Sequence, residues 1–483
     1  MLTSVVHPRC SVSDTVRHFG LDLPVVRDVD LLVVGGGTAG AIAAAAGGRE
    51  GLRTLVVEQF GRLGGTQTSA TVTPMMPNQI DGEPLNGGID LELNRRLMAE
   101  GNSGRFKDGN EGWFNPEMLA CALDDLVAES GAKSLFFTHV VAPLMDGDAV
   151  VGAVVHNTAG LTAIRAQRTI DASGDADLAA RAGVPFEGGD ADGLHQPFAQ
   201  RFMLGGIDFE VFVDFLSEKG RFAITEPQAA GQQPLFTAAM VEDAGWPLEP
   251  LFRQGVADGV LEPVDLNYVQ LFSMNGRPGE VAFNNPRICD DTDGTDPFHL
   301  SRAARVGRQM VRRYAAFFQR YVPGCERAYV SQIAPMVGVR ETRRIVGEYV
   351  LTADDVLSGR TFPDGIARNN YPIDLHRRRE EDSKLIKLPP GTFHEIPYRS
   401  LVPLRVENLL VVGRSLSATF EAQGSVRIQS NCRAMGEAAA RAMAMSLRQG
   451  ITPRQVDGAA LRARLMEHGA RLGPLAATAE VAA

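Results

Sequence analysis

The stretch "DLLVVGGGTAGAIAAAA", Asp30–Ala46, decides the fold of this 483-residue chain. Its aliphatic start, Asp30–Val34, predicts a short buried strand, and the run of small residues over Ala39–Gly48 predicts a helix. The turn between the two fits the pattern GxGxxG with Gly35, Gly37 and Gly40. A strand, a glycine turn and a helix in this order are typical of a Rossmann-like unit that binds a dinucleotide.

The three glycines of this turn each have a physical role in such a unit. The first allows a tight turn, the second lets the backbone approach a pyrophosphate, and the third lets helix and strand pack closely. The N-terminus of the helix then faces the phosphates with free amides and the positive end of its dipole. The alanines of the helix follow the same logic, because small side chains let a helix lie close to a sheet.

An acidic residue at the end of the next strand supports this interpretation. The segment "RTLVVE" predicts a second strand that ends at Glu58, 18 positions after Gly40. A carboxylate about 20 positions beyond the glycines can accept hydrogen bonds from a ribose hydroxyl. GxGxxG alone is a weak signal, but the flanking strands and Glu58 make the dinucleotide prediction specific.

The composition narrows the functional classes. The chain has 44% hydrophobic and 22% charged residues, and its formal net charge of −10 disfavours a nucleic-acid partner. No apolar run reaches the roughly 18 residues of a membrane span, and the N-terminal sequence has no secretory signal. We therefore expect a cytoplasmic protein without a membrane partner. The five cysteines form no CxxC pair and the nine histidines have no metal-ligand spacing, so we expect no metal site.

Three further segments bear on which dinucleotide is bound. "EQFGRLGGTQTSA" resembles the second glycine turn of FAD-binding flavoproteins, and "AQRTIDASGDADLAARAG" resembles a strand that closes the sheet near the adenine end. Far along the chain, "VENLLVVGRSLSATFEAQGSVRIQS" predicts a strand over Leu409–Val412 and a long helix. We expect this helix to open near Gly424 or Ser425 and to run through Leu447. Its N-terminus could face the pyrimidine edge of a flavin and stabilise the negative charge that builds there on reduction.

The chain resembles the large family of FAD-dependent oxidoreductases related to the fumarate-reductase and glutathione-reductase flavoproteins. The resemblance runs from about Val29 to about Leu447 and includes "NGGIDLELNRRL", "FNPEMLACALDDLVAESG", "VGVRETRRIVGEYVLTADDVLSGRTFPDGIARNNYPID" and "EIPYRSLVP". It implies an α/β fold, with a Rossmann-like FAD-binding domain and an inserted α+β substrate domain. It also implies FAD as the cofactor and a small-molecule substrate, whose identity the resemblance leaves open.

The resemblance divides the chain into five parts and implies a set of cofactor contacts. The parts are an N-terminal arm over residues 1–27, the FAD-binding domain over 28–184, a substrate or cap domain over 185–394, the C-terminal part of the FAD-binding domain over 395–450, and a C-terminal helix and tail over 451–483. The predicted FAD contacts are Gly35, Gly37, Thr38, Ala39, Gly40, Glu58, Gln59, Arg62, Gly64, Gly65, Thr66, Val140, Ala172, Ser173, Gly174, Gly413, Arg414, Gly424 and Ser425.

Four side chains are candidates for the chemistry. Arg340, in "VGVRETRR", could bind a substrate carboxylate or carbonyl by a bidentate contact. The alternative for this segment is an Arg–Glu network that pins the joint between the domains. His195, Tyr398 and Arg399 could donate or take a proton while a hydride moves to the flavin. A structural or solvent-facing role is the alternative for His195.

We expect an FAD-dependent dehydrogenase or oxidase that moves a hydride from a small organic substrate to N5 of the flavin. One alternative is a flavin monooxygenase reduced by NAD(P)H, although no second nucleotide-binding GxGxxG is visible. Another alternative is a flavoprotein subunit of a larger complex. Nothing in the sequence determines an oligomeric state, and a homo-oligomer remains open.

Overall fold

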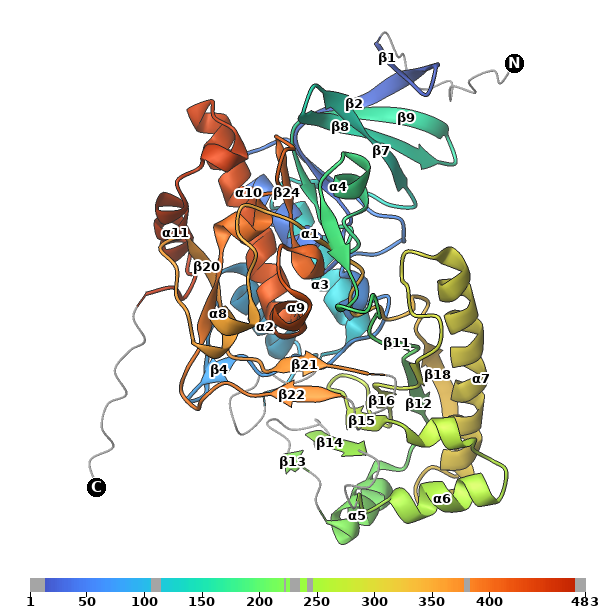
Figure 1. Ribbon diagram of the computed structural model, residues 1–483. Helices are drawn as coiled ribbons and strands as arrows, with labels where there is room; N and C mark the ends of the chain where they lie inside the picture. The colour runs from blue at the N-terminus through green and yellow to red at the C-terminus, as the bar shows by residue number, and fades with distance from the viewer. Residues whose placement is uncertain are drawn as a thin grey trace, which may run out of the picture.

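A computed structural model describes residues 14–105, 114–220, 223–225, 235–240, 246–377 and 383–473. Within these residues the chain forms two large sheets, each covered by helices (Figure 1). The ends of the predicted arm and tail, residues 1–13 and 474–483, lie outside the described residues.

The larger sheet has eight strands and is mixed. Its central strands are parallel, and β2, β3 and β9 end level with one another, because Val34 pairs with both Val57 and Asp171. The residues that follow these strands therefore meet at one edge of the sheet. Across the sheet the strands are β6 (Lys133–Leu135), β3 (Thr54–Val57), β2 (Leu21–Val34), β9 (Gly160–Asp171), β8 (Ala149–Asn157) and β7 (His139–Asp146), with β1 (Thr15–His18) beside β2 and β24 (Leu409–Val411) beside β9.

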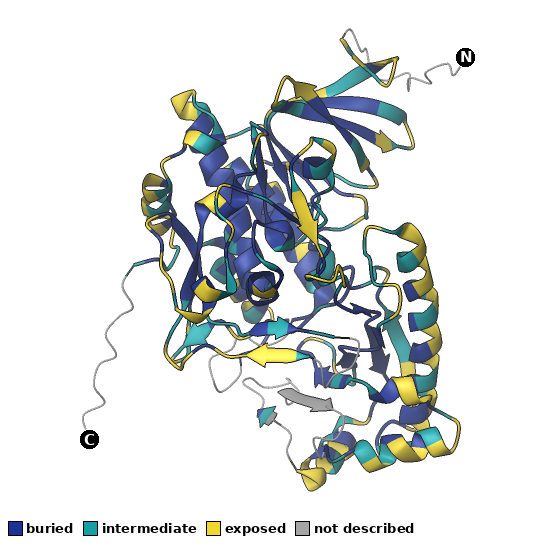
Figure 2. Ribbon diagram, in the orientation of Figure 1, coloured by how far each residue is buried: buried dark blue, intermediate teal, exposed yellow. Residues whose placement is uncertain are grey.

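Two helices at the centre of the molecule cover this sheet. Helix α1 (Thr38–Arg49) packs along α10 (Gln429–Gln449), and Figure 2 shows both as buried. The two backbones touch, since a Cβ atom at Gly436 would lie 2.1 Å from the carbonyl oxygen of Ala39. The remaining helices of this part are α2 (Ile89–Ala99), α3 (Pro116–Glu129), α4 (Asp177–Arg181), α8 (Ala353–Leu357), α9 (Phe420–Val426) and α11 (Gly458–Glu467).

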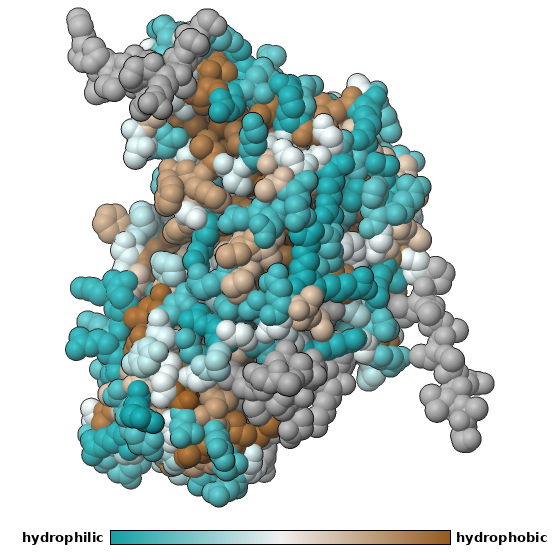
Figure 3. Space-filling view, turned by 180° about the vertical axis from the view of Figure 1, so that it is seen from behind, coloured by the Kyte–Doolittle hydropathy of each residue, from teal (hydrophilic) through white to brown (hydrophobic). Residues whose placement is uncertain are grey.

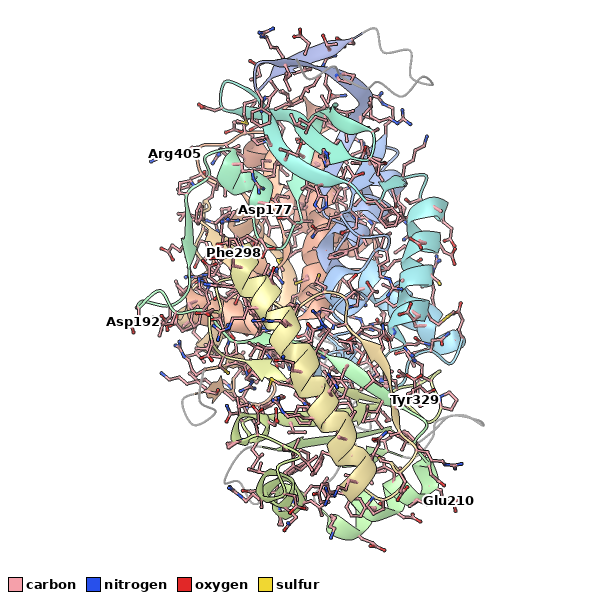
Figure 4. The ribbon with its side chains drawn as sticks, turned by 90° about the vertical axis from the view of Figure 1, so that its right-hand side faces the viewer. Asp177, Asp192, Glu210, Phe298, Tyr329 and Arg405 are labelled. Atoms are coloured by element: carbon pink, nitrogen blue, oxygen red, sulfur yellow. The ribbon has the colours of Figure 1, made fainter. Side chains whose placement is uncertain are left out.

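The second sheet is antiparallel, with six strands and a separate apolar core. Helix α7 (Pro297–Tyr321) runs along it, from Phe298 at one end (Figure 4), and buries an aromatic stripe that includes Tyr314 and Phe317. The other helices here are α5 (Phe209–Lys219) and α6 (Glu249–Ala257). The strand order is β13 (Ala223–Thr225), β14 (Leu235–Met240), β15 (Val269–Ser273), β16 (Val281–Phe283), β12 (Phe202–Gly205) and β18 (Tyr329–Ile333).

Short two-stranded ladders join the two parts. Segments from Leu351 to Val402 pack into the apolar core of the larger sheet, so the predicted boundary at residue 394 falls inside a packed unit. The ladders are β10 (Phe186–Gly188) with β19 (Arg343–Ile345), β11 (Phe198–Ala199) with β17 (Arg287–Ile288), β20 (Gly365–Asn369) with β23 (His394–Pro397), β21 (Ile373–Leu375) with β22 (Lys384–Ile386), and β4 (Gln79–Ile80) with β5 (Glu83–Pro84).

The fold is the α/β class that the sequence predicts, with two local differences. Strand β2 begins at Leu21, so part of the predicted arm belongs to the sheet. The prediction of one helix that opens near Gly424 or Ser425 is wrong, because Ile428 takes an extended conformation (φ −66°, ψ 157°) that separates α9 from α10.

In the part of the chain that the structure describes, no helix combines the length and the apolar character needed to cross a membrane. Figure 3 shows that much of the rear face is hydrophilic, with hydrophobic residues gathered toward the end that carries β7–β9 and again toward the opposite end.

Candidate active site

One cavity of about 750 Å³ begins at the carboxyl edge of the larger sheet and extends to the second sheet. Two groups of residues line it. The glycine cluster consists of Gly35, Gly37, Gly65, Glu58 and Gly413. These residues lie in the turns that follow strands of the larger sheet. The arginine cluster consists of Arg201, Arg340, Arg427, Tyr371, Asp374 and His376.

The glycine turn after β2 has the conformation that only glycine adopts readily. Gly35 has φ +90°, and a Cβ atom there would lie 2.7 Å from the carbonyl oxygen of Ala172. A Cβ atom at Gly40 would lie 1.9 Å from the carbonyl oxygen of Gly35. The first glycine thus forms the turn, the third brings the helix against it, and Gly37 faces the cavity together with Gly35.

A second glycine turn meets the first one. Gly37 precedes α1 and has no side chain to cap the amides of that helix, and Thr38 and Ala39 line the cavity beside it. A Cβ atom at Gly65 would lie 2.8 Å from the Cα atom of Gly37. Together the two turns form a surface of bare backbone at the positive end of a helix, which suits a pyrophosphate.

Glu58 faces the same part of the cavity from the end of β3. Its carboxylate accepts hydrogen bonds from the amides of Gly36 (2.8 Å) and Phe60 (2.9 Å). Burial raises the pKa of Glu58 above its usual range, while these amides oppose the shift. Gln59 and Val140 lie beside it in the cavity wall.

The end of β9 and the turn after β24 complete this wall. Gly413 has φ +81°, and the guanidinium group of Arg414 donates to the carbonyl oxygen of Gly174 (2.6 Å) and to the carboxylate of Asp175 (2.8 Å). Asp177, at the start of α4 in Figure 4, also lines the cavity. The predicted contacts Thr66, Ala172, Ser173 and Gly174 line it as well.

The N-terminus of α10 replaces the helix end expected near Gly424 and Ser425. Ile428 and Gln429 line the cavity, and no side chain caps this helix. Gly424 instead packs on β21, and the Ser425 hydroxyl donates to the carbonyl oxygen of Tyr371 (2.6 Å). The long helix therefore still presents free amides to the cavity, but from residues a few positions later than expected.

Three other predicted contacts lie outside the cavity lining. Gly40 packs on Gly35, and Gly64 takes φ +101° to shape the second turn. Arg62 forms an ion pair with Glu117 of α3. The first two shape the backbone that faces the cavity, and Arg62 ties the second turn to a helix.

Of the four catalytic candidates, only Arg340 lines the cavity. The Tyr398 hydroxyl is buried and donates to the carbonyl oxygen of Pro453 (2.7 Å), and Arg399 pairs with Asp364 (2.9 Å). Each thus has a structural partner away from the cavity.

His195 belongs to the network at the joint between the two parts. Its Nδ1 atom lies 2.8 Å from the carboxylate of Glu341, which also accepts from Arg344 (3.2 Å). The segment after Arg340 thus forms the predicted Arg–Glu network, while Arg340 itself turns to the cavity.

The other members of the arginine cluster carry little or no sequence signal. Arg201 stands within the apolar run "PFAQRFMLGG", and a lone charge in such a run was a usable signal. Tyr371, Asp374 and His376 occur in "NNYPIDLH", where no spacing marks them as a site.

Asp374 organises the polar side chains of the arginine cluster. It accepts from the Tyr371 hydroxyl (3.1 Å) and lies 3.3 Å from Nε2 of His376. Although burial opposes its ionisation, the contact with His376 and the guanidinium groups of Arg427 and Arg340 hold the pKa of Asp374 well below its usual range. Burial lowers the pKa of His376 to about 3. The cluster therefore offers one carboxylate that accepts hydrogen bonds and several cations that attract an anion.

These observations fit FAD. The bare backbone at Gly37 and Gly65, the uncapped start of α1 and the carboxylate of Glu58 match a pyrophosphate and a ribose. The uncapped start of α10 suits an electron-accepting ring. Among the described residues, no group of histidine, cysteine or acidic side chains could hold a metal ion.

Curated relatives match the chain over about a third of its length. Digeranylgeranylglycerophospholipid reductase 1 of Methanopyrus kandleri is 26% identical over 154 residues, which are 30% of this chain and 40% of the relative. Digeranylgeranylglycerophospholipid reductase of Methanoculleus marisnigri is 29% identical over 163 residues, 32% of this chain and 41% of the relative. The chain thus spans about two fifths of the length of the curated relatives it matches.

Solved structures align over most of the chain at low identity. One is p-nitrophenol 4-monooxygenase of Pseudomonas putida, with 13% identity, a TM-score of 0.46, and coverage of 92% of this chain and 86% of that chain. Another is a geranylgeranyl bacteriochlorophyll reductase-like protein of Thermoplasma acidophilum, with 12% identity, a TM-score of 0.42, and coverage of 91% and 83%.

The model of one protein family covers nearly the whole chain, from residue 30 to residue 465. This range includes both glycine turns, the ends of β2, β3 and β9, and the start of α10. The chain is a member of the FAD dependent oxidoreductase family, and its cofactor is FAD.

Proposed function

We propose that this protein is an FAD-dependent dehydrogenase or oxidase that oxidises a small organic molecule by hydride transfer to N5 of the flavin. One observation carries the proposal: a single cavity joins the glycine cluster to a separate group of polar and charged side chains. The substrate would lose a hydride and a proton, and an external electron acceptor would then take the two electrons from the cofactor.

The glycine cluster would hold the cofactor. The backbone of Gly37, Thr38 and Gly65 would bind the pyrophosphate, and Glu58 would accept hydrogen bonds from the ribose. Val140 would lie at the adenine end. The amides at Ile428 and Gln429 would stabilise negative charge on the flavin.

The arginine cluster would hold the substrate. Tyr371 and Asp374 are hydrogen-bonded to each other and line the cavity, so they could orient a hydroxyl or amino group of a substrate. Arg340 could bind an acidic or carbonyl group, the role predicted for it from the sequence.

The curated relatives that match are reductases named for a digeranylgeranyl lipid. Such a substrate would need an apolar wall. In this chain apolar residues such as Met76 and Val339 line the cavity together with Arg201, Arg340 and Asp374, and these charged groups favour a substrate that carries a polar or acidic group.

The flavin spectrum tests the proposal directly. We expect the purified protein to contain FAD, and its visible flavin absorbance to bleach without oxygen when a suitable small alcohol, hydroxy acid or amino acid is added. Bleaching by NADPH alone, with no organic substrate able to reduce the flavin, would instead indicate a monooxygenase or a reductase and overturn the proposal.

A glycine variant tests the cofactor assignment. A Cβ atom at Gly37 would meet nothing closer than 3.9 Å, and its φ of −69° suits any residue. Gly37→Leu should therefore fold, judged by circular dichroism, but contain no FAD, because the side chain would fill the backbone cradle. Normal FAD content in this variant would contradict the assignment.

A further inference from the structure

The cationic side chains of the arginine cluster come from distant parts of the chain. Arg201 precedes β12, Arg340 lies between β18 and β19, and Arg427 lies between α9 and α10. All three line the cavity. Behind them Arg287 of β17 stacks on the Tyr268 ring at 4.0 Å.

Carboxylates in the described part of the chain do not balance these charges. Asp374 lies 3.8 Å from Arg427, and it is the one carboxylate among the described cavity residues of this cluster. Neither Arg201 nor Arg340 forms an ion pair with any described residue. Two guanidinium groups beside the cavity thus have no carboxylate in ion-pair contact within the described part of the chain.

The two charges differ in burial: Arg201 is buried, whereas Arg340 is half-buried and its guanidinium group donates to the carbonyl oxygen of Pro197. Arg201 is 6% exposed, and its Nη1 atom has no hydrogen-bond partner among the described residues. Burial lowers the pKa of Arg201 to about 10. Burial and the neighbouring guanidinium groups, first that of Arg287, lower the pKa of Arg340 to about 9. A buried cation without a partner destabilises the folded state unless an anion joins it.

The phosphates of FAD would not supply that anion. The glycine cluster that suits a pyrophosphate lies at the ends of β2 and β3, whereas Arg201 belongs to the second sheet region. Arg414, which directly follows Gly413 of the glycine cluster, is already paired with Asp175 at 2.8 Å. The charge of the two guanidinium groups therefore belongs to the part of the cavity assigned to the substrate.

We propose that the substrate is a small organic acid with two negative charges, and that Arg201 and Arg340 bind its carboxylates. This inference rests on the proposed function, since it takes one cavity to hold FAD and substrate together. A planar guanidinium group binds a carboxylate through two parallel hydrogen bonds, so two such groups select a dicarboxylate over a monocarboxylate and over a neutral amide.

Binding to the FAD-loaded protein tests this without catalysis. Straight-chain dicarboxylates with two to five carbons, butyrate and succinamide are titrated while the visible flavin spectrum and the melting temperature are recorded. We expect at least one dicarboxylate to bind, butyrate to bind about tenfold or more weakly, and succinamide not to bind.

Arginine variants assign the binding to the two side chains. Arg201→Met and Arg340→Met should each weaken dicarboxylate binding by about tenfold or more. Arg201→Lys should recover part of it. The matched control Arg17→Met, at an exposed position on β1, should bind like the unaltered protein.

The outcomes separate the two proposals. Equal binding of succinamide and dicarboxylates, or unchanged binding in both arginine variants, would overturn the anionic substrate. Flavin reduction by a neutral alcohol alone would also overturn it, while the proposed function would stand. Tight dicarboxylate binding with no flavin reduction by any organic substrate would leave the anion site in place and overturn the proposed function.

Discussion

Helix α10 and the arginine cluster both bury arginine side chains, but only the helix surrounds them with carboxylates. Arg441 of α10 donates to Glu50 (2.6 Å) and to Glu437 (2.8 Å), and all three side chains are buried. Arg201 is as well buried and has no such partner among the described residues. Because Arg441 has two carboxylate partners, the lack of such a partner at Arg201 indicates where the negative charge of a ligand would bind.

The largest expected change in stability follows from removing Arg441, the arginine that has carboxylate partners. Arg441→Met would leave the carboxylate of Glu437 buried without its cation, which should lower the free energy of unfolding by about 3–5 kcal/mol. Urea denaturation of the FAD-loaded protein measures this change. A loss no larger than that of an exposed arginine variant would mean that the network on α10 does not stabilise the fold.

The same substitution at the unpaired arginine should have the opposite sign. Arg201→Met removes a buried cation that lacks a partner, so without substrate the free energy of unfolding should stay the same or rise by up to about 2 kcal/mol. Urea denaturation in a buffer free of organic acids measures it. A loss comparable to that of Arg441→Met would show that Arg201 has a structural partner and would remove the contrast.

His195 lies between these extremes, because it is a half-buried histidine with a buried carboxylate partner. Its contact with Glu341, although opposed by burial, raises the pKa of His195 above 6.5. A raised histidine pKa stabilises the folded state fully below the unfolded value of 6.5, and this contribution disappears as the pH rises through the folded pKa.

The variant His195→Gln should therefore be less stable than the unaltered protein by roughly 1 kcal/mol at pH 5.5 and by less at pH 8.5. Urea denaturation at the two pH values measures the difference. A stability loss that is the same at both pH values would assign His195 a packing role without charge.

The smallest effect is expected for an exposed pair. Arg17 lies 3.5 Å from Asp22 on the β1–β2 hairpin, and both side chains are largely exposed. Arg17→Met should leave the unfolding curve unchanged, because solvent screens such a pair. A clear loss here would mean that burial does not explain the difference between the other two arginines.

Much of the cofactor end could be predicted from the sequence. Gly35 must take a positive φ, Gly40 must lack a Cβ atom, and Glu58 must follow the next strand, and each of these requirements is local. The start of the long helix was missed for a local reason too. The segment from Gly424 to Ile428 contains no proline or clear cap, so nothing in it predicts the break before Gln429.

The sequence by itself thus determined the Rossmann-like unit and the cofactor, because glycine turns and strand ends depend on backbone conformation within a few residues. Only the tertiary structure decided which charged side chains share the cavity. Arg201, Arg340 and Asp374 meet because two sheets and their connecting ladders pack together, while Tyr398 and Arg399 find partners elsewhere. Such contacts join residues far apart in the chain, and no local pattern encodes them.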